Sequence, residues 1–258
     1  MSSLSWSRVT VTSAVVGLCC LVGCPKPQGG IVPPSANGSK AEAPAVSAKA
    51  ATAIADDVKA ARARLDAFGS RTKYAPKAGG LLTEIVIQDG SNLTADDLAL
   101  FGKLSDLEKL QIFNCRSLND EMAATLSGLK GLTSLALTNT VINDATVQMI
   151  VKSFPNLIDL DLSSNTNMTS GVVKIVSEMS QLQRLTLVQN QVNDIGAQRL
   201  SKLQELRALD LRGNMEAGDM ALEVVAALTN SPASSTAAQR SPIRVWSTSA
   251  KTRHWSHC

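Results

Sequence analysis

The sequence of 258 residues contains little histidine and few aromatic residues or cysteines. Both histidines, His254 and His257, lie at the extreme C-terminus, so the rest of the chain lacks an imidazole for acid–base catalysis or zinc binding. Aromatic residues make up 3% of the chain, which argues against binding single-stranded nucleic acid by base stacking. Of the five cysteines, Cys19, Cys20 and Cys24 lie in or directly after an apolar run at the N-terminus. The remaining two, Cys115 and Cys258, are too few for a disulfide framework. The composition therefore disfavours most hydrolases, most zinc sites and nucleic-acid partners.

The formal net charge of +3 is unevenly distributed along the chain. Residues 24–80 carry a net charge of +5 and residues 231–258 carry +4, whereas residues 81–230 carry −7. The excess of basic residues therefore belongs to the two ends. The acidic middle gives no electrostatic support for a nucleic-acid partner.

The N-terminus has the pattern of a secretory signal followed by a lipid attachment site. Residues 9–23 form an uncharged apolar run, shorter than the ~20 residues that a membrane-spanning helix needs. Residues 21–24 read Leu-Val-Gly-Cys, which resembles a bacterial lipobox. The resemblance implies removal of residues 1–23 and acylation of Cys24, so that lipid anchors the protein to a membrane of the bacterial cell envelope, facing the periplasm or the cell surface. The alternatives are a signal cleaved elsewhere and a buried apolar strand.

The next segments are predicted to be a linker and a cap. Residues 24–50 contain five of the nine prolines, and this composition is typical of a flexible linker. Residues 51–80 follow, with a helix predicted over 51–68 and a short hairpin strand over 71–75. The apolar residues at helical spacing are Ile54, Val58, Ala61, Leu65 and Phe68. This face is expected to cover the first repeat of the next domain; a basic amphipathic helix that binds a membrane or a partner is the alternative.

A six-residue frame, Leu-x-x-Leu-x-Leu with some isoleucines, recurs through residues 81–230. Its six copies begin at Leu82, Leu107, Leu132, Leu157, Leu182 and Leu206. A fixed period near 25 residues indicates stacked repeats, each with one short strand and one helix around a shared core. Asn-Asp or Thr-Ser follows each of four strands and predicts the N-cap of the helix.

The frame and the position three residues after it resemble the pattern of leucine-rich repeat proteins, Leu-x-x-Leu-x-Leu-x-x-Asn/Cys. The ninth position holds Gly90, Cys115, Thr140, Asn165, Asn190 and Asn214. The repeat length and the Ile-Asn-Asp theme are similar to the ribonuclease-inhibitor-like and cysteine-containing subclasses. The resemblance implies an α/β leucine-rich-repeat solenoid, a segment of a right-handed horseshoe with a parallel sheet on its concave side and helices on its convex side. Because Gly90 and Thr140 depart from the pattern, we expect the first and third turns to be less well hydrogen-bonded.

The strand positions between the leucines are expected to form the exposed concave face. The candidate partner-binding residues on it are Gln88, Gln111, Phe113, Asn114, Thr138, Asp159, Asp161, Ser163, Arg184, Thr186, Asp210 and Arg212. Phe113 is the natural anchor, since aromatic side chains dominate interface energetics. Asp159, Asp161 and Asp210 invite a catalytic or metal-binding interpretation. However, no third ligand is evident and nothing in the sequence forces a raised carboxylate pKa, so we predict no catalytic residue, metal or cofactor.

Residues 231–258 do not continue the repeat. They contain seven serines and four basic residues but neither leucine nor an acidic residue. We expect this tail to be disordered, or to be translated from a shifted reading frame of a gene that encodes further repeats. His254, His257 and Cys258 form only a weak metal-binding pattern.

The sequence thus predicts a non-enzymatic binding module: a lipid-anchored leucine-rich repeat protein whose concave sheet engages a protein or another extended polymer. A structural envelope spacer or a self-assembling solenoid is the main alternative. An adaptor of ubiquitin-ligase type conflicts with the signal peptide, and an enzyme would depend on the carboxylates alone.

Overall fold

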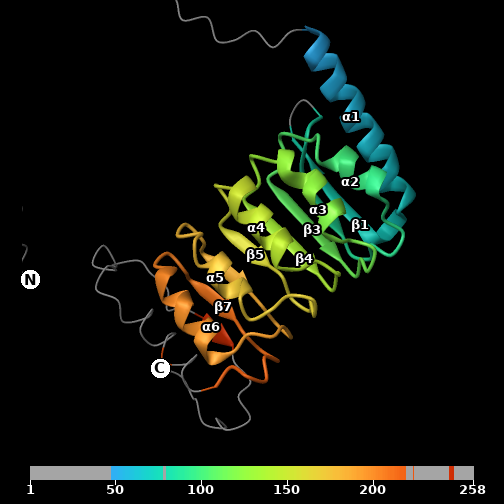
Figure 1. Cartoon of the computed structure of the whole chain (residues 1–258). Helices are drawn as coiled ribbons and strands as arrows, with labels where there is room; N and C mark the ends of the chain where they lie inside the picture. The colour runs from blue at the N-terminus through green and yellow to red at the C-terminus, as the bar shows by residue number, and fades with distance from the viewer. Residues whose placement is uncertain (1–47, 78–79, 219–222, 224–243, 247–258) are drawn as a thin grey trace, which may run out of the picture. The chain divides into compact units, whose positions relative to one another are not determined.

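The structure is a computed structural model, and Figure 1 shows how its elements are arranged. The residues that it describes are 48–77, 80–218, 223 and 244–246. All of them belong to the second of two compact units, Val46–Cys258. The predicted signal peptide, Cys24 and the three predicted weak metal ligands of the tail lie outside the described residues.

The described strands form one eight-stranded sheet in sequence order. They are β1 (Thr72–Pro76), β2 (Leu82–Ile87), β3 (Lys109–Phe113), β4 (Ser134–Thr138), β5 (Asp159–Asp161), β6 (Arg184–Thr186), β7 (Ala208–Asp210) and β8 (Arg244–Trp246). Strand β1 pairs antiparallel with β2, and every later strand pairs in parallel with the one before it. The mostly parallel sheet predicted from the repeat is therefore confirmed.

The strands pair in the register that the repeat period sets. Leu110 lies opposite Leu135, Leu135 opposite Leu160, and Leu160 opposite Leu185. All four side chains are buried. The leucine frame therefore faces the core, as the sequence predicts, because equivalent positions of successive repeats stack above one another.

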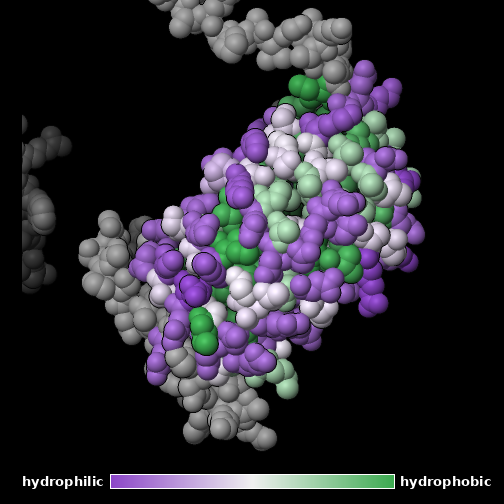
Figure 2. Space-filling view, in the orientation of Figure 1, coloured by the Kyte–Doolittle hydropathy of each residue, from purple (hydrophilic) through white to green (hydrophobic). Residues whose placement is uncertain are grey.

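Helices cover one side of this sheet, and each of strands β2–β6 is followed by one of them (Figure 1). They are α2 (Ala95–Phe101), α3 (Asp120–Ala124), α4 (Asp144–Ser153), α5 (Val172–Val176) and α6 (Asp194–Gln198), with the 3-10 turns η2 (Thr125–Gly128) and η3 (Arg199–Lys202) after α3 and α6. Phe101 and Phe154 are fully buried in the core cluster. Hydrophilic side chains dominate the outer surface on the side that Figure 2 shows.

Helix α1 (Ala48–Ala67) packs its apolar face on the first repeat. Val58, Ala61 and Leu65 are buried in the core cluster. Arg64 forms an ion pair with Asp97 at the start of α2, with a nitrogen–oxygen distance of 2.6 Å. The 3-10 turn η1 (Gly69–Arg71) then leads into β1. The buried face of α1 is consequently occupied by the protein itself and is not available for a membrane.

Asparagine side chains link the turns after β5, β6 and β7. The Nδ2 of Asn165 donates to the carbonyls of Leu137 and Leu162 at 2.7 and 2.9 Å. Its Oδ1 accepts the backbone N–H of Thr140 at 2.9 Å and the Thr140 hydroxyl at 2.6 Å. The prediction of a poorly bonded third turn is therefore wrong, because the fourth repeat supplies an acceptor for it.

The first departure from the repeat pattern has a steric reason. Gly90 is buried, and a Cβ atom at this position would lie 2.7 Å from Cβ of Cys115. The Cys115 side chain is fully buried and its thiol is free. Glycine at the first turn therefore leaves room for the cysteine of the second.

Aspartates of the Asn-Asp motif bridge neighbouring repeats. Asp120 accepts the N–H of Asn143, Asp144 that of Thr169, and Asp194 that of Gly218, at 3.1, 2.9 and 2.7 Å. The N-caps of α3, α4 and α6 are instead the preceding asparagines, Asn119, Asn143 and Asn193. The fourth repeat has Ser170 where the second, third and fifth repeats have aspartate, and the first repeat has Ala95 there.

Strand β8 lies inside the tail for which no regular structure is expected. Its backbone pairs in parallel with β7, with Leu209 opposite Val245. That expectation therefore does not hold for these three residues, whereas a shifted reading frame stays a prediction. The remaining tail residues lie outside those that the structure describes.

Candidate binding face of the sheet

The strand side chains that point away from the leucine core form the open sheet face, in two rows set by the strand register. The outer row is Glu84, Lys109, Ser134, Asp159, Arg184 and Ala208. The middle row is Val86, Gln111, Ala136, Asp161, Thr186 and Asp210. Phe113 and Thr138, which are also register partners, continue the face toward the strand ends. Residues of six successive repeats therefore lie side by side on this face, although Val86, Ser134, Ala136 and Asp210 are themselves buried.

The predicted binding residues differ in how far they reach solvent. Gln88, Asn114, Arg184 and Arg212 are exposed, and Gln111, Phe113, Thr138, Asp159, Asp161 and Thr186 are partly exposed. Ser163 and Asp210 are buried, each with 6% exposure, so their prediction as surface residues is wrong. Ser163 turns toward Asp161, and the Arg212 side chain contacts Asp210 with two nitrogens.

Charges in the outer row are paired between neighbouring strands. Lys109 lies 2.6 Å from Glu84, and Arg184 lies 2.7 Å from Asp159. The hydrogen bond to Asp159 and its charge raise the pKa of the Arg184 guanidinium. These pairs fix long side chains that would otherwise lose rotamer freedom on binding a partner.

Arg212 is held in a bidentate pair by Asp210. Its Nε lies 2.9 Å from Oδ1 and its Nη2 lies 2.6 Å from Oδ2. The hydrogen bonds and the charge of Asp210 raise the pKa of Arg212. The guanidinium plane is therefore oriented by a buried carboxylate while the arginine itself remains exposed.

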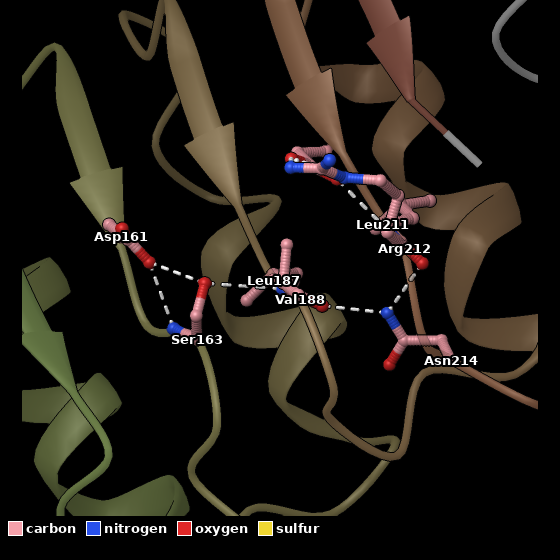
Figure 3. A network of polar contacts seen from close by, with 8 residues as sticks. Asp161, Ser163, Leu187, Val188, Leu211, Arg212 and Asn214 are labelled. Atoms are coloured by element: carbon pink, nitrogen blue, oxygen red, sulfur yellow. Dashed lines mark hydrogen bonds and ion pairs between the residues drawn. The ribbon is translucent and has the colours of Figure 1, made fainter. Parts of the chain in front are cut away.

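Asp161 lies on β5, between Ala136 and Thr186 in the middle row. Figure 3 shows its contacts. Its Oδ1 accepts the N–H of Ser163 at 2.9 Å and the Ser163 hydroxyl at 2.6 Å. The Ser163 oxygen in turn accepts the N–H of Val188 on the next repeat at 3.3 Å. The network thus fixes the orientation of the Asp161 carboxylate.

The pKa of Asp161 is raised, in contrast to the expectation that nothing would raise it. Burial is the largest cause, and the charges of Asp159 and Asp210 add to it. The hydrogen bonds from Ser163 act in the opposite direction. The proximity of Asp210 follows from the register, because Thr186 alone separates the two aspartates in their row.

Phe113 is partly exposed beside Thr138, whose Oγ1 is buried without a hydrogen-bond partner.

Asn114, also predicted to bind a partner, already uses its side chain within the protein. Its Nδ2 donates to the carbonyl of Gln88 at 3.3 Å, and its Oδ1 accepts from Asn139 at 2.8 Å. Phe113 therefore remains a candidate anchor, whereas Asn114 has a structural role.

A backbone feature that the repeat pattern does not predict recurs at the ends of strands. Asn114, Asn139, Ser164 and Gln189 adopt positive φ angles of 53–58°, and Gly213 has φ 75°. Each lies one residue before the turn position of its repeat. Three of the five are Asn or Gly, the residues that most readily adopt this left-handed conformation, whereas Ser164 and Gln189 carry no such signal.

The described residues contain no group of three or more His, Cys, Asp or Glu side chains that could hold a metal ion. One surface hollow of 490 Å³ lies between α4 and α5, and another of 320 Å³ lies at the turns around Asn190 and Met215. Neither is lined by the predicted binding residues. Within the described part of the chain, no helix is both long and apolar enough to cross a membrane.

No protein-family model and no curated protein matches this sequence. Among solved structures, the protein is similar to an internalin from Listeria monocytogenes, with 22% identity over 51% of this chain and a TM-score of 0.41. The matched half of this chain spans 35% of the internalin chain. The register, the buried leucines and the asparagine turns by themselves define a leucine-rich-repeat-like fold.

Proposed function

We propose that this protein is a non-enzymatic binding module that engages a polypeptide with its open sheet face. The observation that carries the proposal is the set of paired charges on this face. Arg184 and Arg212 are exposed, yet each is already oriented by an aspartate of the same face. Such preorganisation lowers the entropic cost of binding a partner.

The extent of the face also supports this function. Side chains of six repeats lie in register, so an extended partner can contact several strands at once. Phe113 supplies a partly exposed aromatic ring beside polar neighbours. Aromatic residues and arginine are the residue types most enriched where interface energy is concentrated.

We further propose that lipid on Cys24 anchors the module to a membrane of the bacterial cell envelope. The apolar run of residues 9–23 and the lipobox-like residues 21–24 support this. Metabolic labelling with an acyl probe tests it: the wild-type protein should carry the label and a Cys24→Ser variant should not. Label retained by the variant would refute acylation at Cys24.

The binding function is tested by affinity capture of envelope proteins with the purified protein. A double variant, Phe113→Ala with Arg184→Ala, should lose the captured partner while its thermal unfolding stays cooperative. A matched control, Lys152→Ala with Glu178→Ala, changes two exposed residues at the hollow between α4 and α5. Equal capture by both variants would contradict a role for the sheet face.

Self-assembly is a second candidate function, favoured by exposed apolar side chains near the last described repeat. Met215 is 98% exposed and Ile195 is 67% exposed. Sedimentation at increasing protein concentration should then show association that Met215→Ser together with Ile195→Ser abolishes. A monomer at every concentration would leave polypeptide binding as the sole proposed function.

A further inference from the structure

One carboxylate of the open sheet face differs from its neighbours in lacking a counter-ion. Asp159 pairs with Arg184, and Asp210 pairs with Arg212. Among the described residues, no cation lies within ion-pair distance of Asp161. The middle of the face therefore carries a carboxylate that no cation of the described residues neutralises.

The unpaired charge has a free and accessible oxygen atom. Both donors from Ser163 bind Oδ1, so Oδ2 accepts no hydrogen bond from the described residues. In the described part of the chain, the side-chain atoms that are both buried and without a hydrogen-bond partner are Arg62 Nε, Thr72 Oγ1 and Thr138 Oγ1. Oδ2 of Asp161 is not among them, so it is not fully buried. It therefore remains accessible to a donor from outside the protein.

The surroundings of Asp161 suit a positively charged group. Its neighbours in the row, Ala136 and Thr186, are small and uncharged. The arginines nearby do not compensate it, since each is bound to its own aspartate. Residues 81–230 carry a net charge of −7, which attracts a cationic partner over a longer range.

We propose that Asp161 binds the side chain of a lysine or arginine in the polypeptide that occupies the open sheet face. The inference rests on the proposed function of that face and adds the chemistry of the partner. Asp161 is only partly exposed, so folding has already removed part of the water around its carboxylate, and this burial is the largest cause of its raised pKa. Pairing it with a cation therefore costs less additional desolvation than pairing a fully hydrated carboxylate would.

The substitution Asp161→Asn removes the charge and preserves the local structure. An asparagine Oδ1 can still accept the N–H and the hydroxyl of Ser163. Glu178→Gln is the matched control, because it removes an exposed carboxylate beside α5, at the hollow between α4 and α5. Thermal unfolding of each variant verifies that it is folded.

The experiment is selection of a random dodecapeptide phage library on the full-length wild-type protein and on the two variants. Wild type and Glu178→Gln should select peptides with a lysine or arginine enriched at one position. Asp161→Asn should still select peptides, without that enrichment. A synthetic peptide from the wild-type selection should bind Asp161→Asn at least about tenfold more weakly, and replacing its basic residue by norleucine should then have little further effect.

The outcomes separate this inference from the function on which it rests. Peptides selected without basic enrichment, or with equal enrichment on Asp161→Asn, would overturn the role of Asp161 and leave polypeptide binding in place. Failure of all three proteins to select any peptide would overturn both.

Discussion

The side chain of Asn165 in the fourth repeat binds the backbone N–H and the hydroxyl of Thr140 in the third, at 2.9 and 2.6 Å. It also donates to two carbonyls, those of Leu137 and Leu162. All atoms of Asn165 lie in the interior. One side chain therefore satisfies polar groups of two neighbouring repeats that water does not reach.

Asn165→Ala should destabilise the protein by about 3–5 kcal/mol, because the buried N–H and hydroxyl of Thr140 lose their acceptor and the carbonyls of Leu137 and Leu162 each lose a donor. Asn167→Ala is the control: this exposed side chain donates only to the Val141 carbonyl, at 3.2 Å, and its loss should cost under about 0.5 kcal/mol. Urea unfolding of both variants measures the difference. Similar free energies of unfolding for the two would contradict a structural role for the asparagine turns.

The part of the fold that sequence predicts is the part set by spacing. A period near 25 residues places Leu110, Leu135 and Leu160 opposite one another. One repeat cannot bury its leucines alone, so the repeats stack and the leucines form a continuous core. The third turn was different, since Thr140 by itself lacks the amide of the consensus. The acceptor for the N–H and the hydroxyl of Thr140 is Asn165. The hydrogen bonding of the third turn therefore depends on the fourth repeat.

The candidate site was less predictable than the fold. The alternation of side chains along a strand correctly places Asp161 and Arg184 on the open face. Alternation does not predict which side chains of that face contact and bury one another. Asp210 is buried beside its arginine, and Ser163 turns toward Asp161. Charge pairing and desolvation depend on such side-chain contacts between repeats, which a sequence pattern does not specify.

Ser170→Asp should stabilise the protein by about 0.5–1.5 kcal/mol. Ser170 stands where Asp144 and Asp194 accept a backbone N–H of the following repeat. An aspartate there is expected to accept the N–H of Asn193 in the same way. Thermal unfolding measures the stability of Ser170→Asp against that of the control Ser180→Asp. The control adds the same charge at an exposed position outside the motif. If Ser170→Asp is no more stable than this control, the bridge does not form.

Gly213→Ala should destabilise the protein by about 1–3 kcal/mol. Its φ of 75° disfavours an L side chain, and a Cβ would lie 2.7 Å from Cγ of Gln189. Gln189→Ala removes that Cγ, so the same glycine substitution should cost less in this background while its backbone component remains. A double-mutant cycle from urea unfolding measures the difference. Additive effects would show that the contact with Gln189 does not contribute.

Asp161→Asn should make the protein more stable at pH 7. Burial, followed by the charges of Asp159 and Asp210, raises the pKa of Asp161 in the native state, so the native protein binds this proton more tightly than the unfolded chain does. The stability contributed by that proton is complete below the unfolded pKa of about 3.9 and is lost as the pH rises through the native value.

The gain from Asp161→Asn should therefore be largest at neutral pH and should shrink as the pH falls toward 4. Urea unfolding across this range measures it, with Glu178→Gln as the control for the loss of one negative charge. A variant less stable than wild type at pH 7 would show that the carboxylate stabilises the native state. A gain in stability together with a loss of basic peptides would instead identify Asp161 as a group retained for binding at the expense of stability.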